Sequence, residues 1–164
     1  MGRRGVTQRG VRAATLLRSA ALGAATGARS SAGIAALAFT SRPTDEGRIA
    51  SVLGSRRGRL VAAVLAAGEL ITDKLPVTPG RTGPPGLAPR VAFGATAAAG
   101  LARREGDQYA LPALVGVGTA VAAAFLGQRL RGVVADRFGS DLPGAVFEDA
   151  AAALLGLRGA RRDS

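Results

Sequence analysis

The 164-residue sequence contains no cysteine, no histidine and no tryptophan. Without cysteine, disulfide frameworks and thiolate metal sites are excluded. Without histidine, the commonest general base and the commonest zinc ligand are missing, which removes most familiar hydrolase chemistries. We therefore expect a protein without cofactor or metal, and enzyme activity is the least favoured of the functional hypotheses.

Acidic residues and lysine are also scarce. Of the 22 basic residues, Lys74 is the only lysine and the others are arginine, against 11 acidic residues and a net charge of +11. An excess of basic residues can indicate nucleic-acid binding, but these arginines lie between apolar runs rather than along one helical face. Membrane proteins keep their cytoplasmic charges in such places. We expect the lipid bilayer, and not nucleic acid, to be the partner.

Only one long run lacks charge altogether, the nineteen residues from 109 to 127. At 1.5 Å per residue a helix of this length matches about 30 Å of hydrocarbon. Pro112 falls in its first turn, where proline is tolerated. This run favours an integral membrane protein.

Other apolar segments predict further helices over residues 19–41, 60–75, 90–102 and 143–158. Residues 42–59 are predicted to form a charged connection, and the prolines from 76 to 89 predict a non-helical one. The fold class expected is therefore all-α, a polytopic membrane helix bundle of four to five hydrophobic helices. One embedded domain, 19–158, would lie between a basic flexible tail, 1–18, and a polar tail, 159–164.

Counting basic residues on each side tests the topology. Five crossings give nearly equal numbers, whereas a segment 19–41 that enters and leaves at one face places most of them on a single side. Because excess Lys and Arg marks the cytoplasm, four crossings with both termini inside are favoured, and five crossings stay open. The expected localisation is the bacterial inner membrane, multi-pass, with an uncleaved cytoplasmic N-terminal tail.

Charged residues inside the apolar segments are the candidate site. They are Arg29, Glu69, Asp73, Arg90, Glu148 and Asp149. Each ionised group at mid-bilayer costs roughly 2.5–3.5 kcal/mol, so these side chains should face one another or a water-filled cavity. Glu69 and Asp73, four residues apart, share one helical face, although Asp73 could instead mark the end of the helix at the interface.

Our hypothesis is that Arg29 and Arg90 compensate the acidic residues in the bundle interior. Two functions stay open at this point. The carboxylates could handle protons or cations in a transporter-like or channel-like protein. Alternatively, they could form a salt-bridge lock in a membrane scaffold or interaction protein.

Small residues recur at four-residue spacing, a pattern that allows close helix packing in membranes. The pairs are Gly23 with Gly27, Gly94 with Ala98, and Gly116 with Ala120. They could serve a homo-oligomer or contacts with other membrane proteins. A chain so rich in glycine and alanine also produces such pairs by chance.

The pattern E-x-x-x-D-K-L-P from Glu69 to Pro76, followed by Pro89-Arg90 and Gly94, by Arg129 to Arg131 and by Glu148-Asp149, resembles a bacterial membrane family. That family is the "domain of unknown function 4126". The stretch Gly27-Ala28-Arg29 also fits, and the resemblance runs from about residue 20 to 157.

Two departures suggest a divergent short member. Pro89 precedes Arg90 where the family has the reverse order, and GSDLPGA replaces a Ser-Pro-Glu-Pro stretch. The resemblance implies an integral inner-membrane protein and supplies no substrate. It points to Glu69, Asp73, Arg90, Glu148 and Asp149 as the residues to test.

Overall fold

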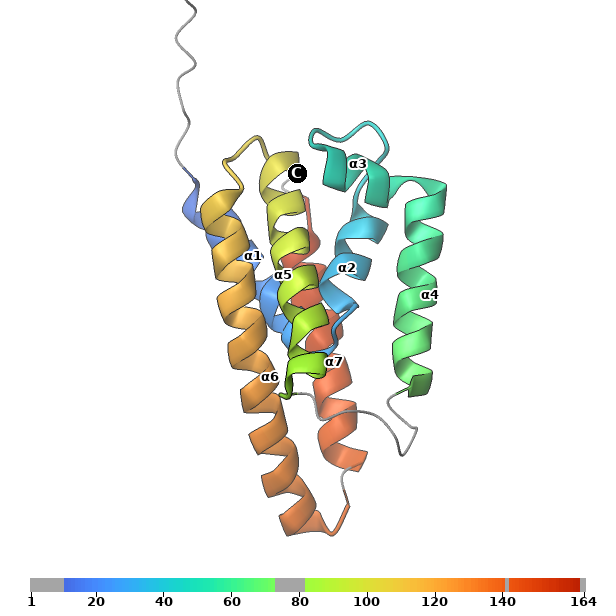
Figure 1. Ribbon diagram of the computed structural model, residues 1–164, viewed down its shortest axis with the longest axis vertical. Coiled ribbons are helices and arrows are strands. Elements are labelled where there is room, and N and C mark those ends of the chain that lie inside the picture. Colours follow the sequence, from blue (N-terminus) through green and yellow to red (C-terminus); the bar gives the residue numbers. More distant parts are fainter. Residues whose placement is uncertain (1–10, 73–81, 141, 163–164) are drawn as a thin grey trace, which may run out of the picture.

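The computed structural model describes residues 11–72, 82–140 and 142–162, whose regular structure is entirely helical (Figure 1). The seven helices are α1 (Ala13–Ala28), α2 (Ala32–Thr40), α3 (Arg48–Gly54), α4 (Arg56–Thr72), α5 (Pro84–Arg104), α6 (Ala110–Phe138) and α7 (Leu142–Ala160). The chain runs down and up the bundle several times, and α1 begins and α7 ends at the same end.

The predicted bundle of four to five membrane-spanning helices is wrong. Among the described residues, only α6 is long and apolar enough to cross a membrane. With 16, 9 and 17 residues, α1, α2 and α4 are too short. The longer α5 consists largely of alanine, glycine and proline, and charges interrupt α7. The structure therefore does not support the multi-pass topology.

The segment 19–41 forms two helices instead of one. α1 ends at Ala28, Arg29 is extended with φ −132° and ψ 119°, and α2 starts at Ala32. The chain reverses at this break, so that the start of α1 and the end of α2 lie at the same end of the bundle (Figure 1). Arg29 thus lies at a helix break rather than at the middle of a span.

Other helix boundaries also differ from the predicted ones. A short helix, α3, lies in the stretch predicted as a charged connection, and α1 begins within the expected tail. The proline-rich connection was predicted to be non-helical, yet α5 begins at Pro84, because prolines in a first turn need no N–H partner. Its residues 76–81 lie outside the described ranges. α6 continues beyond residue 127 and ends at Phe138. The next residue, Gly139, caps the helix with a φ of 65°, which suits glycine.

Small residues make the contacts between α1, α5 and α6. A Cβ at Gly116 would lie 2.5 Å from the Gly94 carbonyl oxygen and 2.7 Å from the Cβ of Ala98. Gly27 would meet the Cβ of Ala123 at 2.6 Å. Since these distances are shorter than van der Waals contact, only glycine permits the backbones to approach so closely. The six residues at four-residue spacing are all buried in the structure.

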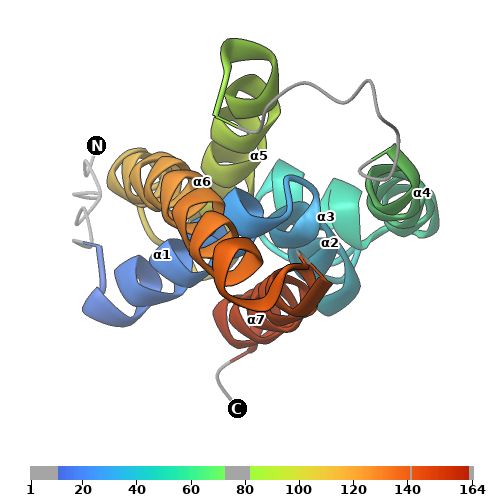
Figure 2. The same cartoon turned by 90° about the horizontal axis from the view of Figure 1, so that it is seen from below.

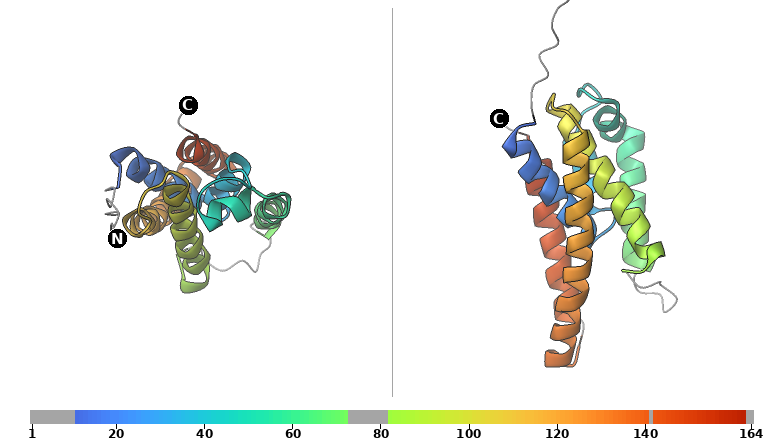
Figure 3. Two further views of the ribbon diagram at one scale, coloured as in Figure 1. Left: turned by 90° about the horizontal axis from the view of Figure 1, so that it is seen from above. Right: turned by 60° about the vertical axis from the view of Figure 1, so that its left-hand side comes forward.

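Large apolar side chains, by contrast, point outward. Within the described ranges, the buried apolar residues larger than alanine are Leu22, Ile34, Leu37, Leu101 and Pro112, whereas 22 large hydrophobic residues are exposed. α4 lies at the edge of the bundle, against α2 and α3 (Figure 2). α6 and α7 extend together beyond the other helices (Figure 3).

Candidate functional site

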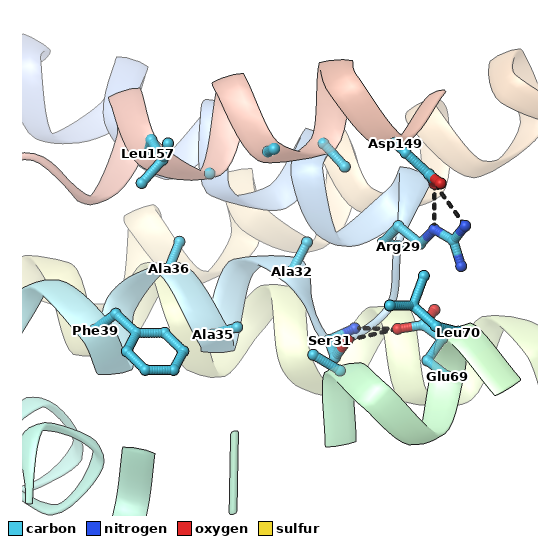
Figure 4. A pocket seen from close by; sticks show the side chains of 14 residues that line it. Arg29, Ser31, Ala32, Ala35, Ala36, Phe39, Glu69, Leu70, Asp149 and Leu157 are labelled. Carbon is cyan, nitrogen blue, oxygen red and sulfur yellow. Dashed lines mark hydrogen bonds and ion pairs between the residues drawn. The ribbon is translucent and has the colours of Figure 1, made fainter. Parts of the chain in front are cut away.

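The break between α1 and α2 positions the first ion pair of the site. Because Arg29 is not part of either helix, its side chain can cross to α7, where Nε and Nη2 lie 2.6 and 2.5 Å from Asp149 Oδ1 (Figure 4). The Arg29 side chain is 14% exposed and that of Asp149 is 42% exposed. This pair joins the end of α1 to the last helix.

Glu69 reaches from α4 to the start of α2. Its Oε1 accepts a hydrogen bond from the Ser30 N–H at 2.6 Å, and Oε2 accepts from the Ser31 N–H and hydroxyl at 2.9 and 2.6 Å. The first N–H groups of a helix have no partner within it, and a carboxylate satisfies them well. Burial alone would raise the pKa of Glu69, but the hydrogen bonds from Ser31 and Ser30 outweigh it and hold that pKa below its usual value.

Arg90 of α5 binds the end of α1, on the other side of the same break. This residue is only 5% exposed. Its Nε donates to the Gly27 carbonyl at 3.1 Å, and its Nη1 donates to the Gly86 carbonyl at 2.6 Å. A guanidinium beside the last carbonyls of α1 is favourable, because the C-terminal end of a helix carries partial negative charge. Arg90 and Glu69 therefore stabilise the two helix ends that the break creates.

Glu148, also buried, connects α6 to α7. Its Oε2 lies 3.3 Å from Nη1 of Arg131. Glu148 is one of the predicted site residues, but its pairing with Arg131 was not predicted. The two residues meet because the chain turns back between α6 and α7, and no local spacing reports that turn.

The structure brings most of the predicted residues to one region without joining them all. Arg29 and Asp149 form an ion pair. Glu69 and Arg90 bond to the backbone at the break between α1 and α2. Asp73 lies outside the described residues.

A groove of about 400 Å³ opens beside this region, between α2, α4 and α7 (Figure 4). Arg29, Asp149 and Glu69 lie at one end, and Phe39 and Leu157 lie toward the other. Alanines of α2 and α7 form much of the wall between them. The groove is therefore apolar along its length and charged at one end.

A second charged cluster lies at the opposite end of the bundle, and sequence reasoning missed it. Asp107, in the connection between α5 and α6, is only 4% exposed. It accepts hydrogen bonds from the Thr15 hydroxyl and from Nε of Arg12 at 2.5 and 3.2 Å. Burial favours a higher pKa, but these bonds and the Arg12 charge lower the pKa of Asp107. A single acid in a polar connection gives no pattern that would reveal it.

Within the described residues, no group of three or more acidic, histidine or cysteine side chains could hold a metal ion. Comparison with protein-family models finds no match, and comparisons with curated proteins and with solved structures find no similar protein. The resemblance to the "domain of unknown function 4126" family therefore stays a prediction.

Proposed function

We propose that this protein is a non-catalytic, membrane-anchored interaction protein, in which α6 inserts into the bilayer and the charged residues lock the helices together. The observation that carries the proposal is the exposure of α6. Only 22% of the apolar 18-residue stretch of α6 is buried inside the protein. Two other kinds of helix share such length and hydropathy, the core helix of a soluble protein and a signal sequence. A core helix would be mostly buried, and a signal sequence would lie near the N-terminus.

The distribution of side-chain size supports the same conclusion. A protein in water buries its large apolar residues, and large exposed apolar patches mark sites of protein or membrane interaction. Here the interior is mainly alanine and glycine, while Leu114, Leu126 and other large residues of α6 are exposed. Small residues between helices and large residues facing outward are the arrangement expected next to lipid.

The contacts of the charged residues favour a lock over a proton pathway. At the break between α1 and α2, Glu69 bonds to the start of α2 and Arg90 bonds to the end of α1, while Arg29 bonds from the break to α7. A proton carrier works best with a pKa near the ambient pH, whereas the pKa of Glu69 is lowered. A carboxylate that stays ionised and caps a helix end has a structural role.

Partners would bind at the apolar outer faces. The glycine and alanine pairs that could serve a homo-oligomer or contacts with other membrane proteins pack within the chain, where α1, α5 and α6 meet. The outer face of α4, with Leu60, Val61 and Val64 exposed, is the surface open to lipid or to another membrane protein.

Membrane fractionation tests the anchoring. The full chain, expressed in bacteria, should stay in the membrane pellet after an alkaline carbonate wash. Arginine at Leu114 and Gly118, both exposed on α6, should release it, because each buried charge costs roughly 2.5–3.5 kcal/mol on insertion scales.

The matched control places two arginines outside α6, at Leu17 of α1 and Val52 of α3, which are also exposed. This variant should stay in the pellet. Recovery of the wild-type chain in the carbonate supernatant would contradict membrane anchoring. Equal release of both variants would show that α6 has no special role.

A further inference from the structure

The groove between α2, α4 and α7 has the form of a binding site for an amphiphile. From Ser31 to Phe39 its α2 wall is about 12 Å long at 1.5 Å per residue. Ala32, Ala35 and Ala36 line this wall, and Ala153 and Leu157 of α7 lie across from it. Such small side chains leave a channel wide enough for one hydrocarbon chain, and ligand sites in proteins are mostly apolar with few polar groups.

The polar end of the groove presents negative charge. The Nε and Nη2 atoms of Arg29 both contact Oδ1 of Asp149. Among the described residues, none bonds to Oδ2 of Asp149, and this side chain is three times as exposed as Arg29, 42% against 14%. Glu69 also lines this end. The accessible hydrogen-bonding group is thus a carboxylate oxygen, which accepts and cannot donate.

We propose that this groove binds a lipophilic cation, a single alkyl chain that ends in an ammonium group. The chain lies along α2 toward Phe39 and Leu157, and the ammonium donates a hydrogen bond to Oδ2 of Asp149. An ammonium suits this position because it carries three donors and the charge opposite to that of the carboxylate. A fatty acid of equal length would bring a second carboxylate next to Asp149 and Glu69, which is repulsive.

Equilibrium dialysis with radiolabelled decylammonium and decanoate tests the proposal. The purified full chain is held in phosphatidylcholine nanodiscs, and empty nanodiscs correct for partition into lipid. Decylammonium should bind saturably and at least tenfold more tightly than decanoate. Equal or tighter binding of decanoate would overturn the proposal, because the recognition would then not depend on the charge of the head group.

Two variants locate the site. Asp149→Asn keeps the shape of the side chain and removes its charge, and it should weaken decylammonium binding about five- to tenfold. Ala153→Phe fills the groove from an exposed position and should abolish saturable binding of decylammonium. The second variant leaves the ion pair intact, so it tests the site even if Asp149→Asn fails to fold.

The matched control is Ala150→Phe, the same substitution at an exposed α7 position that does not line the groove. It should bind decylammonium like the wild type. Circular dichroism confirms that each variant is folded before binding is compared. Wild-type affinity in folded Ala153→Phe would place the cation elsewhere and overturn the proposal. Equal loss in Ala150→Phe and Ala153→Phe would do the same.

Discussion

Arg29 and Asp149 are 120 residues apart in the sequence, yet Arg29 Nε lies 2.6 Å from Asp149 Oδ1. The pair forms where α1 breaks, and it joins that break to the last helix. Glu69 holds the start of α2 at the same place through Ser30 and Ser31. Helices rich in alanine have few large side chains to fix how they meet, so such polar contacts specify the packing of α2 against α4 and α7.

A double-mutant cycle measures the contribution of the ion pair. We expect Arg29→Ala and Asp149→Ala to show a coupling energy of about 1 kcal/mol, small because Asp149 is partly exposed. The free energy of unfolding is measured in one detergent for wild type, both single variants and the double variant. The cycle of Asp149→Ala with Arg48→Ala, an exposed arginine of α3, should be additive. Additivity for Arg29 and Asp149 as well would mean that the pair stabilises nothing.

Glu69→Gln should destabilise the protein by about 1–2 kcal/mol, because an amide offers one acceptor oxygen where the carboxylate uses two. Thermal unfolding followed by circular dichroism measures the loss. Glu46→Gln removes an acidic charge at an exposed position and should leave the unfolding temperature unchanged. If the two substitutions had the same effect, Glu69 would not act as the cap of α2.

Gly116→Ala should lower the free energy of unfolding by about 1–3 kcal/mol, since the new methyl group would overlap the Gly94 carbonyl and Ala98. Gly118→Ala is the matched control on the same helix. A Cβ at Gly118 meets no atom within 4 Å, and alanine is the better helix former, so this variant should be neutral or slightly more stable. Chemical denaturation of both variants provides the comparison. A Gly116→Ala protein as stable as wild type would contradict the close contact of α5 and α6.

Asp107 should make stability depend on pH in the acid range. Its pKa in the folded state lies below the value of about 3.9 expected in the unfolded chain. The stabilisation is therefore complete above pH 4 or so and is lost as the pH falls through the folded-state pKa. Asp107→Asn should cost about 1–3 kcal/mol at pH 6, because hydrogen bonds to a buried charge are lost, and less at pH 3.

Unfolding free energies at the two pH values, for wild type and Asp107→Asn, test this expectation. Asp136→Asn, at an exposed position of α6, is the control and should change stability little at either pH. A cost of Asp107→Asn that stays the same from pH 6 to pH 3 would contradict an ionised Asp107 in the folded protein.

Several features of the fold could be predicted because they depend on neighbouring residues. Residues 110–127 of the uncharged run lie in α6 and residues 143–158 lie in α7, since long, mainly apolar segments whose prolines fall in the first turn favour a helix. The number of membrane spans could not be predicted in this way. The break after Ala28 divides a segment that hydropathy alone had suggested as one helix.

The sequence by itself determined the chemistry available, namely arginine and carboxylate side chains without histidine or cysteine, carried on apolar helices. Only the tertiary structure decided the partners, Arg29 with Asp149, Glu69 with the start of α2, and Arg131 with Glu148. Helical periodicity relates residues three or four positions apart and is therefore visible in the sequence. Contacts between distant helices depend on where each helix breaks or turns and on how closely glycine lets the backbones approach, which no local pattern contains.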